Sequence, residues 1–222
     1  IDYQLMEGPN PAELSAAVSY PTSAGNPTLA IDELPEFFAD LEDLSLKMQH
    51  AIKLQLLWSV RTSVVTNSRD EWLHLQEGFC VVPAGTPGLK QKVQALKTSQ
   101  DFVIPLTPVA REIVIARSGN GYLFGARHSN AKPMFSTAPT NMLARIKDGK
   151  WKGRVTPHGF RAMFMTTAVE VFKFDDRIAD LCLGHAIGNQ VHRAYNRAQL
   201  LDERRKLMLM WEQLLIDNGL RV

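Results

Sequence analysis

The sequence predicts a mainly helical fold with one small antiparallel β-sheet. Apolar residues recur at helical spacing along most of the chain, whereas the short apolar runs typical of strands fall near residues 72–106. With 222 residues, of which 45% are hydrophobic and 22% charged, the chain is long enough to bury a sizeable core. Its longest apolar runs are much shorter than the ~18 residues of a membrane-spanning helix. We therefore expect a globular domain without a membrane partner.

The chain is expected to open with a lead-in and two helices. Residues 1–30 are rich in Pro, Gly, Ser, Asn and Ala and contain no base, which predicts a linker or loosely packed lead-in to a domain over 31–222. Apolar spacing predicts helices over about 31–43 and 45–59, with Leu46 among the core candidates of the second. The chain starts without Met and shows no signal-peptide pattern, so we expect it to begin inside a longer protein.

Two strands and then a series of helices are expected to follow. Phe79-Cys80-Val81-Val82 and Phe102-Val103-Ile104-Pro105-Leu106 predict strands, and the Gly-, Pro-, Lys- and Gln-rich segment 84–100 predicts their connection. From residue 107 onward the pattern is mainly helical. Helices are expected over about 107–116, 137–146 and 198–217. Another begins at Thr156-Pro157, with Thr as N-cap and Pro at the first helical position. A further helix runs from Asp175 or Asp176 to about Leu183.

The net charge of +2 conceals an uneven distribution. Residues 1–50 contain nine acids and one base, a charge of −8, so the remainder carries +10. Between residues 145 and 161 a single acid, Asp148, stands among basic residues, a density that can neutralise phosphates and release counterions. A solvated basic loop is the alternative. The candidates for nucleic-acid contact in this cluster are Arg145, Lys147, Lys150, Lys152 and Arg154.

Three short segments in the second half carry the chemistry. They are Thr156-Pro157-His158-Gly159-Phe160-Arg161, Leu183-Gly184-His185 and Ala194-Tyr195-Asn196-Arg197. His158 and Arg161 are three residues apart at an expected helix start, so they share a face. Arginine offers a planar fork to phosphate oxygens, and a tyrosine hydroxyl becomes a nucleophile beside positive charge or a base. Each residue alone more often has a structural role, but the ordered set indicates phosphoryl transfer without a metal.

This ordered set resembles the tyrosine recombinases, the phage-integrase family. The match covers about residues 30–217, and the tail from Ala194 to Trp211 is most similar to integrases of prophages and genomic islands. The resemblance implies the tyrosine recombinase catalytic-domain fold, that of the DNA breaking-rejoining enzymes. It also implies an amino-terminal core-binding domain, which we expect to be absent from this chain.

The resemblance extends the candidate site upstream. It implies that Arg61, after an apolar helix, is the first catalytic arginine and that Lys97 is the hairpin lysine, with Lys92 and Lys90 as alternatives that also contact DNA. The sequence departs from the family at Val64, where the family has an acid that helps to hold its surroundings. Asp101-Phe102 also replaces the Pro-His commonly found before the hairpin strand. The six catalytic residues so implied are Arg61, Lys97, His158, Arg161, His185 and Tyr195.

The activity implied is site-specific DNA recombination, the integration or excision of a mobile element through a 3′-phosphotyrosyl intermediate. It needs no metal, ATP or other cofactor. The implied partners are double-stranded DNA attachment sites and, on DNA, three further copies in a homotetramer, whereas an isolated domain is expected to be monomeric. Cys80 and Cys182 form no disulfide framework, so we expect a reduced, cytoplasmic protein encoded by a bacterium or a phage.

Three other functions remain open from the sequence. One is a recombinase-like DNA-binding protein that has lost turnover, for which Val64 is the only support. Another is a type IB topoisomerase, which shares the chemistry but not the integrase-like tail. The third is a helical RNA-binding or scaffold protein with accidental motif matches. Convergence of Arg61, Arg161 and His185 on one cleft would disfavour this third possibility.

Overall fold

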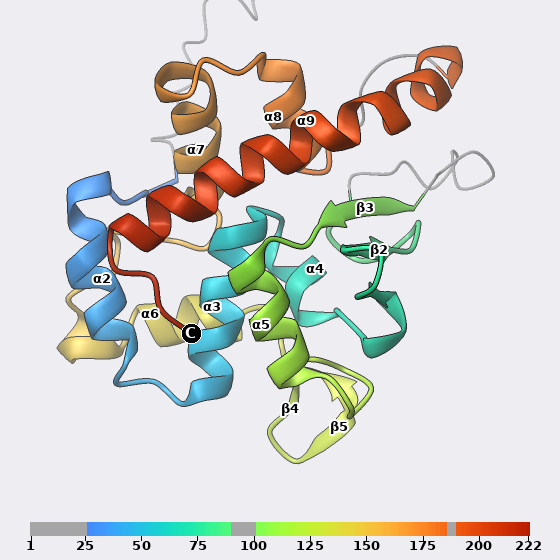
Figure 1. The fold of residues 1–222 in the computed structure, drawn as a ribbon. Helices are drawn as coiled ribbons and strands as arrows, with labels where there is room; N and C mark the ends of the chain where they lie inside the picture. Colours follow the sequence, from blue (N-terminus) through green and yellow to red (C-terminus); the bar gives the residue numbers. More distant parts are fainter. Residues whose placement is uncertain (1–25, 90–100, 186–189) are drawn as a thin grey trace, which may run out of the picture.

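The fold is mainly helical, and helices surround one central helix (Figure 1). The computed structural model describes residues 26–89, 101–185 and 190–222, and of residues 190–199 it describes the backbone only. The central helix is α3 (Leu46–Trp58), in which every residue from His50 to Trp58 is buried. Its first residue, Leu46, is 53% exposed, so its expected place in the core is wrong.

The amino-terminal elements form close to where the sequence predicts them. A 3₁₀ turn η1 (Ile31–Glu33) leads into α2 (Leu34–Leu41), and α4 (Thr62–Thr66) follows α3 after a sharp turn. Among residues 26–30, Leu29 is only 3% exposed, so this part of the lead-in is packed rather than loose. The rest of the expected lead-in, residues 1–25, lies outside the described residues.

The predicted sheet has three antiparallel strands in the order β1-β2-β3. They are β1 (Leu73–His74), β2 (Phe79–Val82) and β3 (Phe102–Pro105). Phe79 pairs with Pro105 and Val82 with Phe102. Because β3 is the last strand in the order, it lies at an edge of the sheet, where a proline is tolerated. A second hairpin, β4 (Gly125–Ala126) and β5 (Ser129–Pro133), is not predicted from the sequence. Its strands are short, and β5 is mostly exposed and polar, so no apolar alternation reveals it.

The carboxyl-terminal half is helical apart from that hairpin. Its elements are α5 (Pro108–Arg117), α6 (Ala138–Leu143), the 3₁₀ segment η4 (Ile146–Gly149), α7 (Gly159–Thr166), the π-helical η5 (Thr167–Val171), α8 (Asp176–Cys182) and α9 (Gln190–Asp217). α6 ends early, and η4 then holds Lys147 and Asp148 in left-handed conformations with φ of 48° and 55°. α9 begins at Gln190, whereas the sequence predicts a start near residue 198. Tyr195 therefore lies within the last helix, although the prediction places it before that helix.

The start of α7 also differs from the prediction. The helix begins at Gly159 and not at Pro157, although the Thr156 hydroxyl does accept a hydrogen bond from the Gly159 N–H at 3.0 Å, as a capping side chain would. Residues of the lead-in pass directly over this point. A β-carbon on Gly159 would lie 1.9 Å from the Pro27 carbonyl oxygen, so only glycine allows the two segments to approach so closely.

The long helix α9 crosses the domain and is fixed to it by buried polar contacts (Figure 1). The Glu212 carboxylate is 2% exposed and accepts hydrogen bonds from the backbone N–H groups of Val109 and Ala110 and from the Thr107 hydroxyl. A side chain of α9 therefore caps the start of α5. Within the described ranges, no helix is long and apolar enough to cross a membrane.

Candidate active site

The centre of the candidate site is the buried guanidinium of Arg161, near the start of α7. Arg161 is 4% exposed, and its Nη1 donates hydrogen bonds to the backbone carbonyls of Ser59 at 2.8 Å and Leu183 at 3.0 Å. These carbonyls follow the ends of α3 and α8, so three helices hold one side chain in place. A guanidinium fixed in this way presents its other nitrogen, Nη2, with little conformational freedom.

The second arginine, Arg61, reaches the same region from the turn between α3 and α4. Ser59 in this turn has a left-handed backbone with φ of 51°, which reverses the chain and aims its carbonyl at Arg161. Strained backbone of this kind is often found at functional sites. Two residues later, Arg61 is half-buried, and its Nη1 donates to the Gly88 carbonyl at 2.7 Å.

His185 completes the described part of the site. Its Nε2 lies 2.7 Å from Nη2 of Arg161, and its Nδ1 lies 2.8 Å from Oδ1 of Asp180, one turn earlier on α8. Gly184, with φ of +71°, ends the helix region and turns the chain so that His185 faces Arg161. The structure thus brings Arg61, Arg161 and His185 together.

The electrostatics of the site favour an anion. Burial and, to a smaller extent, repulsion from Arg61 lower the pKa of Arg161 to about 10, although attraction to Asp180 acts in the opposite direction. Burial also lowers the pKa of Arg61. Arg61 and Arg161 are two desolvated cations close to each other, and the carboxylate of Asp180 contacts His185 rather than either arginine. The site therefore carries an excess positive charge that a phosphate group would neutralise.

The two ends of the connection between β2 and β3 meet this site. At the first end, the Gly88 carbonyl accepts the hydrogen bond from Arg61, and Leu89 follows it. At the second end, β3 begins at Phe102. A β-carbon on Gly184 would lie 3.4 Å from the Phe102 ring and 3.7 Å from Leu89. Lys90, Lys92 and Lys97 belong to this connection but lie outside the described residues, so their assignment stays a prediction.

The two remaining candidates are placed only in part. His158 is the exposed N-cap residue of α7, and its carbonyl accepts from the Arg161 N–H at 3.1 Å. Tyr195 lies near the start of α9 by its backbone, and its side chain is outside the described part. Arg204, further along α9, is 7% exposed and donates from Nη2 to the Val103 carbonyl at 2.5 Å. This contact ties the helix that carries Tyr195 to β3.

The predicted basic cluster is largely occupied by the protein itself. Nζ of Lys150 lies 2.5 Å from Asp40 and 2.6 Å from Glu36, both on α2. Lys147 pairs with Asp43 at 2.8 Å, and Arg154 pairs with Glu33 at 2.5 Å. The acidic stretch before residue 50 therefore covers part of the basic stretch after 145. Of the five predicted DNA contacts here, only Arg145 and Lys152 have no ion pair within the described ranges.

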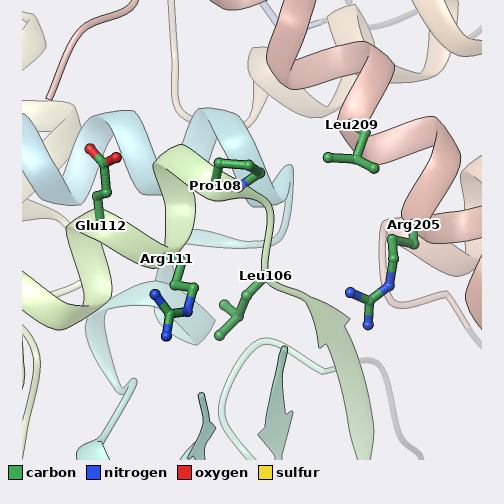
Figure 2. A pocket seen from close by; sticks show the side chains of 6 residues that line it. All are labelled: Leu106, Pro108, Arg111, Glu112, Arg205 and Leu209. Atoms are coloured by element: carbon green, nitrogen blue, oxygen red, sulfur yellow. The ribbon is translucent and has the colours of Figure 1, made fainter. Parts of the chain in front are cut away.

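A separate pocket of about 410 Å³ lies between β3, α5 and α9. Figure 2 shows Arg111 and Arg205 on either side of Leu106, with Leu209 on α9 beyond Pro108. The four predicted catalytic residues whose side chains the structure describes, Arg61, His158, Arg161 and His185, do not line it. In the described part of the chain, no group of three or more His, Cys, Asp or Glu side chains is arranged to hold a metal ion.

Sequence reasoning missed the groups that orient the site. Asp180, Ser59 and Gly88 all contact a predicted catalytic residue, and only the position of Asp180, five residues before His185, carries a usable signal. Val64 is 1% exposed and packs in the core, so the carboxylate that the resemblance leads one to expect at this position is replaced by an apolar contact.

The chain shares its fold with a recombinase of known structure. The crystal structure of XerA recombinase superposes on the chain with a TM-score of 0.56, covering 85% of this chain and 66% of that one, at 18% sequence identity. The predicted tyrosine recombinase fold is therefore confirmed. No family model matches the sequence.

The sequence relatives are integrases of prophages and phages. Prophage integrase IntZ of Escherichia coli K12 is 29% identical over 217 residues, which cover 94% of this chain and 50% of that protein. Prophage integrase IntA of the same strain is 25% identical, covering 97% and 51%, and the integrase of Shigella phage Sf6 is 27% identical, covering 91% and 51%. The chain spans about half the length of these relatives. Its predicted similarity to prophage integrases is confirmed.

Proposed function

We propose that this chain is the catalytic part of a site-specific recombinase that integrates or excises a mobile DNA element. The observation that carries the proposal is the convergence of Arg61, Arg161 and His185, which come from three separate segments of the chain. Such convergence is hard to explain by chance matches to short motifs. The similarity to prophage integrases over nearly the whole chain supports the same reaction class.

In the proposed reaction, the hydroxyl oxygen of Tyr195 attacks a DNA backbone phosphorus. The bond between phosphorus and the 5′ oxygen breaks, and a 3′-phosphotyrosyl bond forms. Arg61 and Arg161 bind the non-bridging oxygens as negative charge develops on them, and His185 donates a hydrogen bond to the same group. The fixed position of Arg161 between two carbonyls means that little reorganisation is needed when the charge develops.

Two further residues handle protons in this scheme. His158 takes the proton of the tyrosine hydroxyl, and Lys97 gives a proton to the leaving 5′ oxygen. A 5′-hydroxyl from a partner strand then attacks the phosphotyrosyl bond, releases Tyr195 and completes strand exchange. The covalent bond preserves the phosphodiester energy, so the scheme requires neither ATP nor a metal.

The substrate in this proposal is a pair of double-stranded attachment sites, which four copies of the protein bring together in the cytoplasm of a bacterial host. Without DNA we expect the 222-residue chain to be monomeric. Light scattering of the chain with and without attachment-site DNA would measure both states.

The test is formation of a covalent protein–DNA product on a nicked attachment-site duplex. Tyr195→Phe should abolish the product, because it removes the attacking oxygen. Tyr122→Phe is a matched control, since Tyr122 stacks under Arg69, which is not a catalytic candidate, with 4.4 Å between the guanidinium carbon and the ring centroid. Product that persists in Tyr195→Phe would refute the assignment. Relaxation of supercoiled plasmid without attachment sites would instead indicate a topoisomerase.

A further inference from the structure

The ring of His185 is hydrogen-bonded on both sides, and the chemistry of its partners fixes where its proton lies. Nη2 of Arg161, 2.7 Å from Nε2, can only donate, so Nε2 must accept. The ring proton is then on Nδ1, where it points to Oδ1 of Asp180 at 2.8 Å. In this DNA-free state His185 is therefore a neutral imidazole in its Nδ1–H form.

This arrangement has a consequence for the binding of a phosphate group. The Nε2 lone pair faces Arg161, so His185 carries no proton that it could donate to an anion on that side. To donate, the ring must take up a second proton at Nε2 and become an imidazolium beside two arginines. Such a cation needs a compensating negative charge, and Asp180 is the carboxylate that contacts the ring.

We propose that Asp180 is a positioning residue for His185. It holds the ring in the Nδ1–H form and, when a phosphate draws Nη2 of Arg161 away, allows Nε2 to take a proton from solvent. The resulting Nε2–H group then donates a hydrogen bond to a phosphate oxygen and keeps its proton. The ring gains one proton and returns it to solvent when the phosphate leaves. This inference rests on the proposed function, because it assigns a role in the same reaction.

The surroundings of the ring support Asp180 as the source of this charge. From α7 the ring faces the guanidinium of Arg161, and behind it lies Arg61 at the start of α4, so both neighbouring elements contribute positive charge. From the sheet side, Gly184 next to the ring faces the apolar side chains of Phe102 and Leu89. Only Asp180, on the helix that precedes the ring, contributes a carboxylate contact within the described part of the chain.

The first measurement is made without DNA. In the chain with ¹⁵N-labelled histidine, long-range proton–nitrogen spectra near pH 7.5 should show His185 with Nδ1 protonated and Nε2 bare. Asp180→Ala should free the ring from its fixed orientation against Arg161 and give a mixture of the Nδ1–H and Nε2–H forms, since it removes the acceptor on Nδ1. Asp176→Asn is the matched control, because it removes a charge from the same helix at an exposed position and should leave the spectrum of His185 unchanged.

The second measurement is the pH profile of covalent product formation. Asp180→Asn keeps the size of the side chain but removes its charge, so product formation should fall by about tenfold at pH 8 and recover toward wild type near pH 6. Asp176→Asn should follow the wild-type profile.

An equal loss at every pH, or an Nε2–H ring in the wild-type chain, would overturn the inference. If the wild-type chain formed no covalent product, the proposed function would fail, while the spectra would still decide whether Asp180 holds the ring.

Discussion

Nη1 of Arg61 lies 2.7 Å from the carbonyl oxygen of Gly88, and this contact joins the turn after α3 to the start of the β2–β3 connection. The carbonyl points to Arg61 because Gly88 has φ of +98°, a conformation that other residues rarely adopt. A β-carbon here would lie 2.3 Å from the Ser63 hydroxyl oxygen and 3.1 Å from a methyl carbon of Val64, so an added side chain would have to displace both.

Gly88→Ala should therefore reduce catalysis by moving the carbonyl that holds Arg61. We expect covalent product formation on a nicked duplex to fall between tenfold and a hundredfold, the scale on which small misplacements act. Gly119→Ala is a close control, because Gly119 has the same φ of +98° but no atom within 4 Å of an added β-carbon. Equal effects of the two substitutions would show that backbone strain, and not the position of Arg61, limits the reaction.

The sequence was sufficient to predict this fold and to nominate members of the candidate site because the informative residues carry local signals. The helix positions follow from apolar spacing, and Arg161 and His185 stand in recognisable short motifs. Ser59, Gly88 and Leu183 act through their backbone carbonyls, which any residue type possesses, so their roles depend on tertiary structure alone. The same is true of the ion pairs, since the positions of Glu36 and Lys150 in the chain give no hint that they meet.

The pairing between α2 and the basic stretch predicts different roles for Lys150 and Lys152. Lys150 bridges Asp40 and Glu36, and the hydrogen bonds to these two carboxylates raise the pKa of Lys150. The exposed Lys152, in contrast, has no ion pair in the described part of the chain. Lys150→Met should lower the midpoint of thermal unfolding, and Lys152→Met should not. If Lys152 contacts DNA, its loss should reduce the salt slope of DNA binding by about one.

The same two variants test whether the pairs persist on DNA. Lys150→Met should leave the salt slope close to wild type, because its charge is already balanced by α2. A loss of slope for Lys150→Met equal to that of Lys152→Met would mean that α2 gives up Lys150 to the phosphates.

The buried contact between α9 and α5 predicts a stability effect at Glu212. Its carboxylate satisfies two backbone N–H groups at the start of α5 and the Thr107 hydroxyl, and of these residues Thr107 and Ala110 are buried. Glu212→Ala should lower the free energy of unfolding by about 2–3 kcal/mol, measured by denaturant titration. Gln213→Ala, which removes only an exposed contact to Asp217, should cost less than about 0.5 kcal/mol. A small effect at Glu212 would mean that water replaces the carboxylate.

His50 in α3 predicts how stability changes with pH. It is 2% exposed, and burial, followed by repulsion from Arg117 and Lys53, lowers its pKa from 6.5 to about 4. Between these two values the unfolded chain binds a proton that the folded chain does not, so stability is full above pH 6.5 and falls as the pH drops toward 4. We expect the free energy of unfolding to decrease by about 1–2 kcal/mol between pH 7.5 and pH 5 because of this residue.

Denaturant titration at these two pH values separates His50 from the other histidines. His50→Phe should remove most of the decrease, because phenylalanine cannot take up a proton. His128→Gln, on the exposed β4–β5 hairpin, should keep it. Glu33 and Asp40 have lowered pKa values, and their stabilisation is lost only as the pH falls below their ordinary values of 4.5 and 3.8. They therefore contribute little between pH 7.5 and pH 5. An unchanged decrease in His50→Phe would show that His50 finds a proton-accepting partner or water in the folded chain.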